Sequence, residues 1–107
     1  MSVRFYAKGA ESQVVEMHNG GARIFLALLG QNCTDNLQGS LGLRRMRARL
    51  ASLTPEQVTS RAVPSRRIDA LEVDHGISAE DLLEDWAALQ ALVREAERVG
   101  AKNIRWG

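Results

Sequence analysis

The sequence predicts an α+β domain: a small sheet that includes both chain termini, packed against three to four helices. Residues 3–6 and 103–106 alternate apolar and polar side chains as strands do. Residues 79–99 repeat their apolar side chains at helical spacing instead. The 107-residue chain is 45% apolar and 25% charged, which is ordinary for one globular domain. We therefore treat 1–107 as a single domain.

The first third of the chain predicts one strand and leaves a second element open. Residues 3–6 are rich in β-branched and aromatic side chains, and Lys8-Gly9 ends them; residues 13–17 are a second candidate extended segment. Asn-Gly at 19–20 between two apolar runs is typical of a hairpin. Alternatively, Asn19 caps a buried helix that Gly30 ends. Three leucines and two alanines without alternation, within 22–30, favour the helix.

The middle of the chain predicts two further helices. Residues 31–40 are turn-rich, and an apolar stripe then predicts an amphipathic helix over 41–53, with Leu43, Met46, Leu50 and Leu53 in the stripe. Thr54-Pro55-Glu56-Gln57 combines an N-cap, a proline at the first helical position and capping-box spacing, so a short helix begins there. Pro64 prevents its extension. Residues 68–73 fit a strand or a packed loop.

The helix over 79–99 has the clearest boundaries. Ser78 and Asp81 form a capping pattern, and Arg98 followed by Gly100 is typical of a helix end. Its apolar stripe consists of Leu82, Trp86, Leu89, Val93 and Ala96, widened by Leu83 and Leu92. If the strands over 3–6 and 103–106 pair, the two termini are neighbours.

Composition argues against a membrane or secreted protein. No apolar run approaches the roughly 18 residues of a membrane span. The first residues lack a basic segment followed by an apolar one, so no signal peptide is indicated. Cys33 is the only cysteine and cannot form an internal disulfide. We therefore expect a cytoplasmic protein.

Charge is distributed unevenly, although the net charge is only +1. Residues 44–67 contain seven arginines and one glutamate, whereas residues 69–97 contain nine acids and one arginine. Either the two segments neutralise each other, within the fold or across a homo-oligomer interface, or the basic segment binds an anionic partner. The candidate binding residues are Arg44, Arg45, Arg47, Arg49, Arg66 and Arg67. They fit a protein partner or a small anionic ligand, because guanidinium groups pair with phosphate and carboxylate.

A second candidate anion site lies at the start of the helix predicted over 22–30. Its residues are Asn19, Gly20, Gly21 and Arg23, where free backbone N–H groups can cradle a phosphate. This glycine pair lacks the spacing of the known phosphate-binding loops. Nucleic acid is not favoured as a partner, because the aromatic residues are few and not interleaved with the arginines.

No catalytic residue, metal site or cofactor is predicted. Cys33 with His18 or His75 is an arithmetically possible nucleophile pair without any local signature. A metal site from His18, Cys33, Asp74 and His75 lacks the short paired spacings of zinc ligands. The acid pairs at 80–81 and 84–85 are explained as solvated helix charge, with Asp85 at the edge of the apolar stripe.

Three segments together resemble a family of small bacterial and phage-borne proteins. They are the strand at 3–6, the Asn-Gly-x-Ala helix of residues 19–30 that ends in Leu-Gly, and residues 78–107, which end in Trp-Gly. The resemblance covers about half of the chain and departs at Gly21, where a second asparagine is expected. It implies the architecture and no activity.

The sequence leaves three hypotheses for function. The leading one is a non-enzymatic binding protein, a small regulator or inhibitor that acts by occupying a partner. The alternative is a protein that sequesters a small phosphorylated ligand such as a nucleotide. The third is an enzyme whose site the sequence does not reveal.

Overall fold

A computed structural model describes residues 2–31, 37–64, 66–67, 73–74 and 76–107. The elements in chain order are β1 (Ser2–Tyr6), the 3-10 turn η1 (Glu11–Gln13), β2 (Val15–His18), α1 (Asn19–Leu28), β3 (Gly39–Gly42), α2 (Leu43–Ser52), α3 (Pro55–Thr59), β4 (Arg66–Arg67), β5 (Val73–Asp74), α4 (Ala79–Val99) and β6 (Asn103–Trp106). This is the α+β architecture that the sequence predicts.

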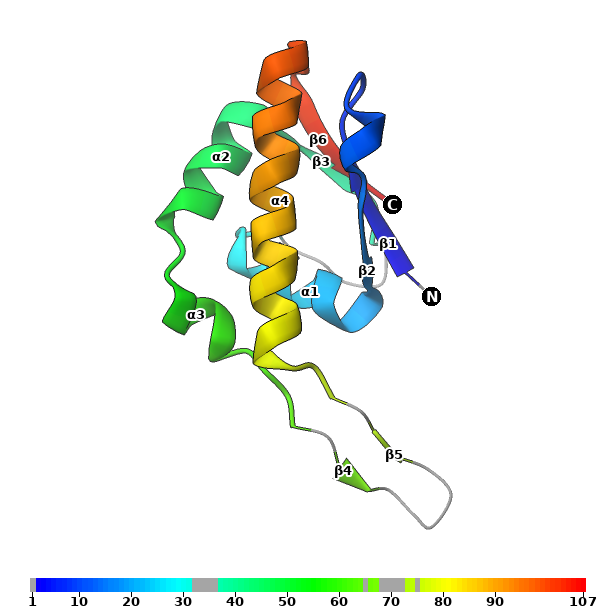
Figure 1. The fold of residues 1–107 in the computed structure, drawn as a ribbon, viewed down its shortest axis with the longest axis vertical. Coiled ribbons are helices and arrows are strands. Elements are labelled where there is room, and N and C mark those ends of the chain that lie inside the picture. Colours follow the sequence, from blue (N-terminus) through cyan, green and yellow to red (C-terminus); the bar gives the residue numbers. More distant parts are fainter. Residues whose placement is uncertain (1, 32–36, 65, 68–72, 75) are drawn as a thin grey trace.

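Four antiparallel strands form the main sheet, in the order β2-β1-β6-β3. The first and last strands are therefore its two central strands, as Figure 1 shows. Phe5 lies opposite Trp106 and Tyr6 opposite Arg105. The backbones of Arg4 and Gly107 exchange two hydrogen bonds of 3.1 Å. The predicted pairing of the terminal strands is confirmed.

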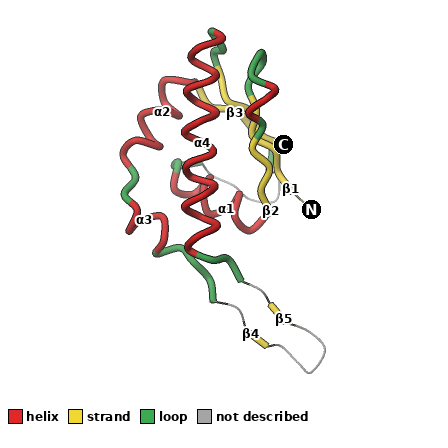
Figure 2. The backbone as a smooth tube through the Cα atoms, viewed as in Figure 1, coloured by secondary structure: helices red, strands yellow, loops and turns green. Residues whose placement is uncertain are grey.

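The helices cover one face of this sheet, and the core lies between them (Figures 1 and 2). Alternate strand residues point into the core, and the aromatic rings of Phe5 and Trp106 lie 6.0 Å apart between centroids. The largest fully buried side chains of the helices are Phe25, Leu26, Met46, Leu50, Leu82, Leu89 and Leu92. Helices α2 and α3 pack against α4.

The helix boundaries follow the capping signals. The Ser78 hydroxyl accepts a hydrogen bond of 3.0 Å from the N–H of Asp81 at the start of α4. At its end Gly100 has a φ of 77°, and Ala101 donates its N–H to the carbonyl of Ala96 at 2.9 Å. Thr54 caps α3 in a complete capping box.

Residues 19–28 form a helix, which decides between the two interpretations of that segment. Asn19 is its first residue rather than its cap, so that detail of the prediction is wrong. Strand β2 continues into the helix without a loop, and His18, at the end of the strand, takes the cap position. Its Nδ1 accepts from the N–H of Gly20 at 3.4 Å. Gly30 has a φ of 76°, which is consistent with the predicted helix end.

Strand β3 was not predicted, and the helix predicted over 41–53 begins two residues later than expected. Gly39 lies against the indole ring of Trp106, so β3 forms where the last strand offers it a partner. Most of the segment 68–73, predicted as a strand or loop, lies outside the described residues; Val73 belongs to β5. Strands β4 and β5 pair with each other and lie away from the main sheet (Figure 1).

Candidate functional site

The face of the sheet opposite the helices is not covered by any of the described helices. Alternation along the strands places Arg4 and Tyr6 of β1, Glu16 of β2, and Asn103 and Arg105 of β6 on this side, and all five are exposed. We call this surface the open face. The alternation at 3–6 and 103–106 predicts strands there, but no local motif gives the exposed residues of these strands a function.

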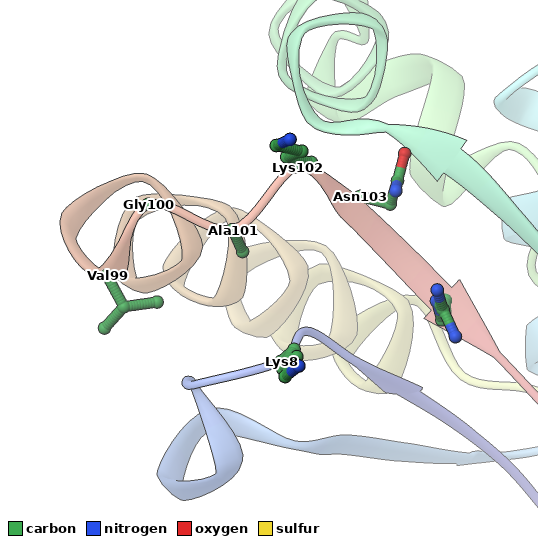
Figure 3. Close-up of a pocket in the computed structure, with 7 residues that line it drawn as sticks. Lys8, Val99, Gly100, Ala101, Lys102 and Asn103 are labelled. Carbon is green, nitrogen blue, oxygen red and sulfur yellow. The ribbon is translucent and has the colours of Figure 1, made fainter.

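The two central strands separate at one end of the open face. The pairing of β1 with β6 runs from the Arg4–Gly107 hydrogen bonds to Tyr6–Arg105 and ends there, and the first residues of β6 pair with β3 alone. Beyond Tyr6 the chain turns at Lys8-Gly9, where Gly9 has a φ of 90°. The separation leaves a hollow of about 480 Å³, shown in Figure 3 and called here the cationic hollow. Its lining residues are Lys8, Val99, Gly100, Ala101, Lys102, Asn103 and Arg105.

Positive charge dominates this hollow. Lys8, Lys102 and Arg105 line it together with the Asn103 side-chain amide, and none of its seven lining residues is acidic. Within the described part of the chain, none of these three cations forms an ion pair. Lys8 follows β1, whereas Lys102 and Asn103 stand at the start of β6 on the other side of the hollow (Figure 3).

One structural role competes with ligand binding here. Cations near the end of a helix stabilise the negative end of its dipole, and α4 ends at this hollow. However, Arg98 already stands in the last turn of α4. The cap also satisfies two of the last carbonyls, through the N–H groups of Gly100 and Ala101. The helix end therefore accounts for only part of the positive charge that surrounds it.

A second, larger hollow of about 790 Å³ adjoins the first on the open face, and we call it the Tyr6 hollow. Its lining residues are Arg4, Tyr6, Ala7, Lys8, Glu11, Val14, Glu16 and Arg105, so it shares Lys8 and Arg105 with the cationic hollow. Tyr6 is 40% exposed and Val14 is 42% exposed. They are two of the four large hydrophobic residues exposed among the described residues.

The two acids of the Tyr6 hollow are already engaged. Glu16 accepts hydrogen bonds from the Ser2 hydroxyl at 2.9 Å and from Arg4 Nε at 3.2 Å. These two bonds, with the charge of Arg4, lower the pKa of Glu16 below its ordinary value. Glu11 accepts a hydrogen bond of 3.2 Å from the N–H of Gly9. The acids therefore leave Lys8 and Arg105 without a neutralising partner.

The six arginines predicted as binding residues do not form one group. Arg47 forms an ion pair of 3.2 Å with Glu97 of α4, which is the neutralising role considered from the sequence. The guanidinium group of Arg49 packs against Gly30, after the end of α1. Arg44 and Arg45 are exposed and make no ion pair within the described residues.

Arg66 and Arg67 lie far from these helical arginines. Both belong to β4, which pairs with β5 at the opposite end of the molecule from α2 (Figure 1). The candidate binding residues of β4 and of α2 therefore lie apart in the fold (Figure 1). The reason is that α3 separates the two parts of the basic segment.

Two side chains lie close to the glycines of the anion site predicted at the start of α1. Gly21 is buried, and a Cβ atom added to it would lie 3.8 Å from Oδ2 of Asp85. A Cβ atom added to Gly20 would lie 3.1 Å from Cδ1 of Ile77. Arg23 is exposed on the next turn. A carboxylate and an apolar side chain therefore lie beside the two glycines, and the anion site at this helix start stays a prediction.

The remaining sequence candidates add no second site. Cys33 and His75 lie outside the described residues, so the prediction that Cys33 is a packing residue stays a prediction. His18 caps α1. Among the residues that the structure describes, no cluster of three or more His, Cys, Asp or Glu side chains could hold a metal ion.

Comparison of the chain with protein-family models, with curated proteins and with solved structures finds no match. None of the helices in the described ranges has the length and apolar character needed to span a membrane.

Proposed function

We propose that this chain is a non-enzymatic binding protein whose cationic hollow takes a phosphate-bearing ligand. The observation that carries the proposal is that Lys8, Lys102 and Arg105 line one hollow with no acid among its lining residues. Three cations on one concave surface repel one another, and a multiply charged anion relieves that repulsion. The Asn103 amide adds a donor, and the Arg105 guanidinium can bind phosphate through two N–H groups.

The fold supports this role because it fixes two of the cations on separate supports. Arg105 stands on a central strand, whereas Lys8 stands on the turn after β1. A ligand bound between them would bridge the ends of β1 and β6 where the strands have separated. Among the described residues, the β1–β6 pairing ends at Tyr6–Arg105. We therefore expect bound phosphate to stabilise the protein as well as to occupy the hollow.

Calorimetric titration with inorganic tripolyphosphate at low ionic strength tests the proposal. We expect the double variant Lys8→Gln/Lys102→Gln to bind at least about tenfold more weakly, since each lost charge-assisted contact contributes about 1.5–3 kcal/mol. The matched control is Arg61→Gln/Arg94→Gln, which removes two exposed positive charges outside the hollow. Equal loss of binding in the control, or no binding by the parent protein, contradicts the proposal.

Arg44 and Arg45 support a second candidate function, that of a regulator or inhibitor that occupies an acidic protein partner. Both guanidinium groups are exposed on α2 and lack an ion pair within the described ranges. Native mass spectrometry of the protein purified from its own host is the test. A co-purified protein that is lost in Arg44→Glu/Arg45→Glu, at an unchanged melting temperature, supports this function. A double variant that unfolds identifies the two arginines as structural.

A further inference from the structure

We infer that the ligand of this open face is a nucleotide unit, whose base stacks on Tyr6 while its phosphate lies in the cationic hollow. This inference rests on the proposed function and adds the aromatic part of the ligand. Its basis is the juxtaposition of the two hollows, which share Lys8 and Arg105 and differ in character. One is cationic, and the other contains the exposed Tyr6 ring and Val14.

Tyr6 has the placement of a stacking platform. It stands on a central strand of the sheet, and its side chain projects from the open face with 40% of its surface exposed. Arg4 precedes it by two residues on the same face, and Arg105 lies directly opposite it on β6. The Arg4 guanidinium is engaged by Glu16, whereas Arg105 forms no ion pair within the described residues. An exposed aromatic ring next to an arginine on the neighbouring strand is typical of surfaces that bind unpaired bases by stacking and cation–π contact.

The spacing of the two hollows fits one nucleotide. Lys8 follows Tyr6 by two residues, so their Cα atoms lie at most about 7 Å apart. A base and its phosphate are separated by a single sugar, so one nucleotide can contact Tyr6 and Lys8 together. Arg105 borders both hollows and can contact either the base or the phosphate. Val14 extends the apolar surface beside the ring.

The sequence does not favour nucleic acid as a partner, but that prediction considers only residues that are neighbours along the chain. Along the chain, aromatic residues and arginines are not interleaved, but the pairing of β1 with β6 places Arg105 opposite Tyr6, and Arg4 lies two residues before Tyr6 on the same face of β1. None of the described helices covers the open face and Tyr6 is exposed on it, so it suits a base that is already unstacked. A free nucleotide and a nucleotide within a single strand share this chemistry, and the experiment separates the two sources.

The chain contains a single tyrosine, so one spectroscopic label reports on the platform. Protein labelled with 3-fluorotyrosine gives one ¹⁹F signal, to be recorded with ATP, with a single-stranded oligothymidylate of twelve nucleotides, with a mixed-sequence duplex of the same length and with tripolyphosphate. We expect ATP or the single strand to shift the signal by the ring current of the stacked base. Tripolyphosphate should shift it much less. A stronger response to the single strand than to ATP identifies the strand as the source, and the reverse identifies the free nucleotide.

Affinity measurements on two variants complete the test. We expect Tyr6→Thr, which preserves strand propensity, to weaken nucleotide binding about 5- to 150-fold, the range that corresponds to loss of one stacked base. Tyr6→Phe retains the ring and should bind nearly as tightly as the parent. Both variants should bind tripolyphosphate unchanged, because they leave Lys8, Lys102 and Arg105 in place.

The outcomes distinguish this inference from the proposed function. If tripolyphosphate binds but neither ATP nor the oligothymidylate shifts the label, the nucleotide inference is overturned and the phosphate-binding function remains. Equal affinity of Tyr6→Thr and the parent for both nucleotide probes overturns it as well, as does tighter binding of the duplex than of the single strand. If neither tripolyphosphate nor a nucleotide binds, both proposals fail.

Discussion

Asp85 places a carboxyl group in the half-buried contact between α4 and the start of α1. Its Oδ2 lies close to Gly21, and no described residue forms an ion pair with it. Burial raises the pKa of Asp85 above its ordinary value, and the charges of Asp81 and Glu84 raise it further. The neutral form is therefore favoured in the folded protein relative to the unfolded chain.

The first prediction concerns the pH dependence that follows. A raised folded-state pKa contributes stability that is fully present below the ordinary pKa of 3.8 and is lost as the pH rises through the folded-state value. We expect Asp85→Asn to raise the melting temperature at pH 7 and to have no stabilising effect near pH 3. Thermal melts at the two pH values measure this. Glu84→Gln is the control on the exposed side of α4. If it raises the melting temperature at pH 7 as much as Asp85→Asn does, the effect comes from helix charge rather than from burial.

The role of a residue can be predicted from the sequence when the residues that it contacts are near it in the sequence. The acids at 80–81 and 84–85 were assigned to helix surface charge, and Asp85 was placed at the edge of the apolar stripe, because periodicity fixes the face of a helix residue. Tyr6 was assigned only to a strand. Its neighbour Arg105 is 99 positions away, and no local pattern connects the two.

Strand β3 shows at the element scale what the sequence could not predict. Gly39, Ser40, Leu41 and Gly42 have little strand propensity as a group, yet they pair along their whole length with β6. By contrast, the sequence placed α4 at 79–99 and the structure gives Ala79–Val99, because helix ends are set by nearby caps. Local signals predicted the helices, and a non-local partner determines this strand.

The second prediction uses the contact that holds β3 in place. A Cβ atom on Gly39 would lie 2.7 Å from Cζ2 of Trp106, whereas one on Gly42 would meet nothing within 4 Å. We expect Gly39→Ala to lower the free energy of unfolding by about 1–3 kcal/mol, the usual cost of overpacking. Gly42→Ala, in the same strand, should change it by less than about 1 kcal/mol. Urea denaturation measures both, and similar values for the two variants would show that Trp106 moves aside without cost.

The third prediction concerns the contact between α2 and α4. The indole N–H of Trp86 donates a hydrogen bond of 3.2 Å to the carbonyl of Leu50. Trp86→Phe keeps an aromatic ring in the half-buried position and removes the donor, so we expect a loss of about 1 kcal/mol in the free energy of unfolding. Leu83→Ala, an exposed position on the same helix, is the control for a general change in α4. No difference between Trp86→Phe and the parent protein would show that water replaces the indole at that carbonyl.

At the scale of the whole molecule, closure of the chain ends explains both the sheet and the candidate site. The sequence predicted that residues 3–6 and 103–106 are neighbours, since both alternate and both lie at the ends of the chain. It did not predict the cationic hollow, because that hollow forms where β1 and β6 cease to pair. Seven arginines lie close together in residues 44–67, so the sequence predicts a basic segment there. The three cations of the hollow, Lys8, Lys102 and Arg105, are too far apart in the sequence to form a local pattern.

The last prediction tests how far the fold depends on this closure. Strand β6 lies between β1 and β3, so deletion of residues 104–107 removes one partner from each of them. It also removes the buried side chains of Ile104 and Trp106, and truncating a buried tryptophan alone costs about 3–5 kcal/mol. Because that cost is a large part of the stability of a small domain, we expect the truncated protein to show no cooperative thermal transition.

Two matched variants separate loss of the strand from loss of the chain end or of the open face. Deletion of Gly107 alone removes its two backbone hydrogen bonds with Arg4, and it should lower the melting temperature while the transition remains cooperative. Arg105→Gln keeps the strand and should melt close to the parent protein, because Arg105 is exposed and forms no ion pair within the described residues. That variant should nevertheless bind tripolyphosphate more weakly. Calorimetric melts of the three proteins measure these differences. If the truncated protein melts at the same temperature as the full chain, β6 does not contribute to the core. The structural basis of the cationic hollow would then be wrong as well.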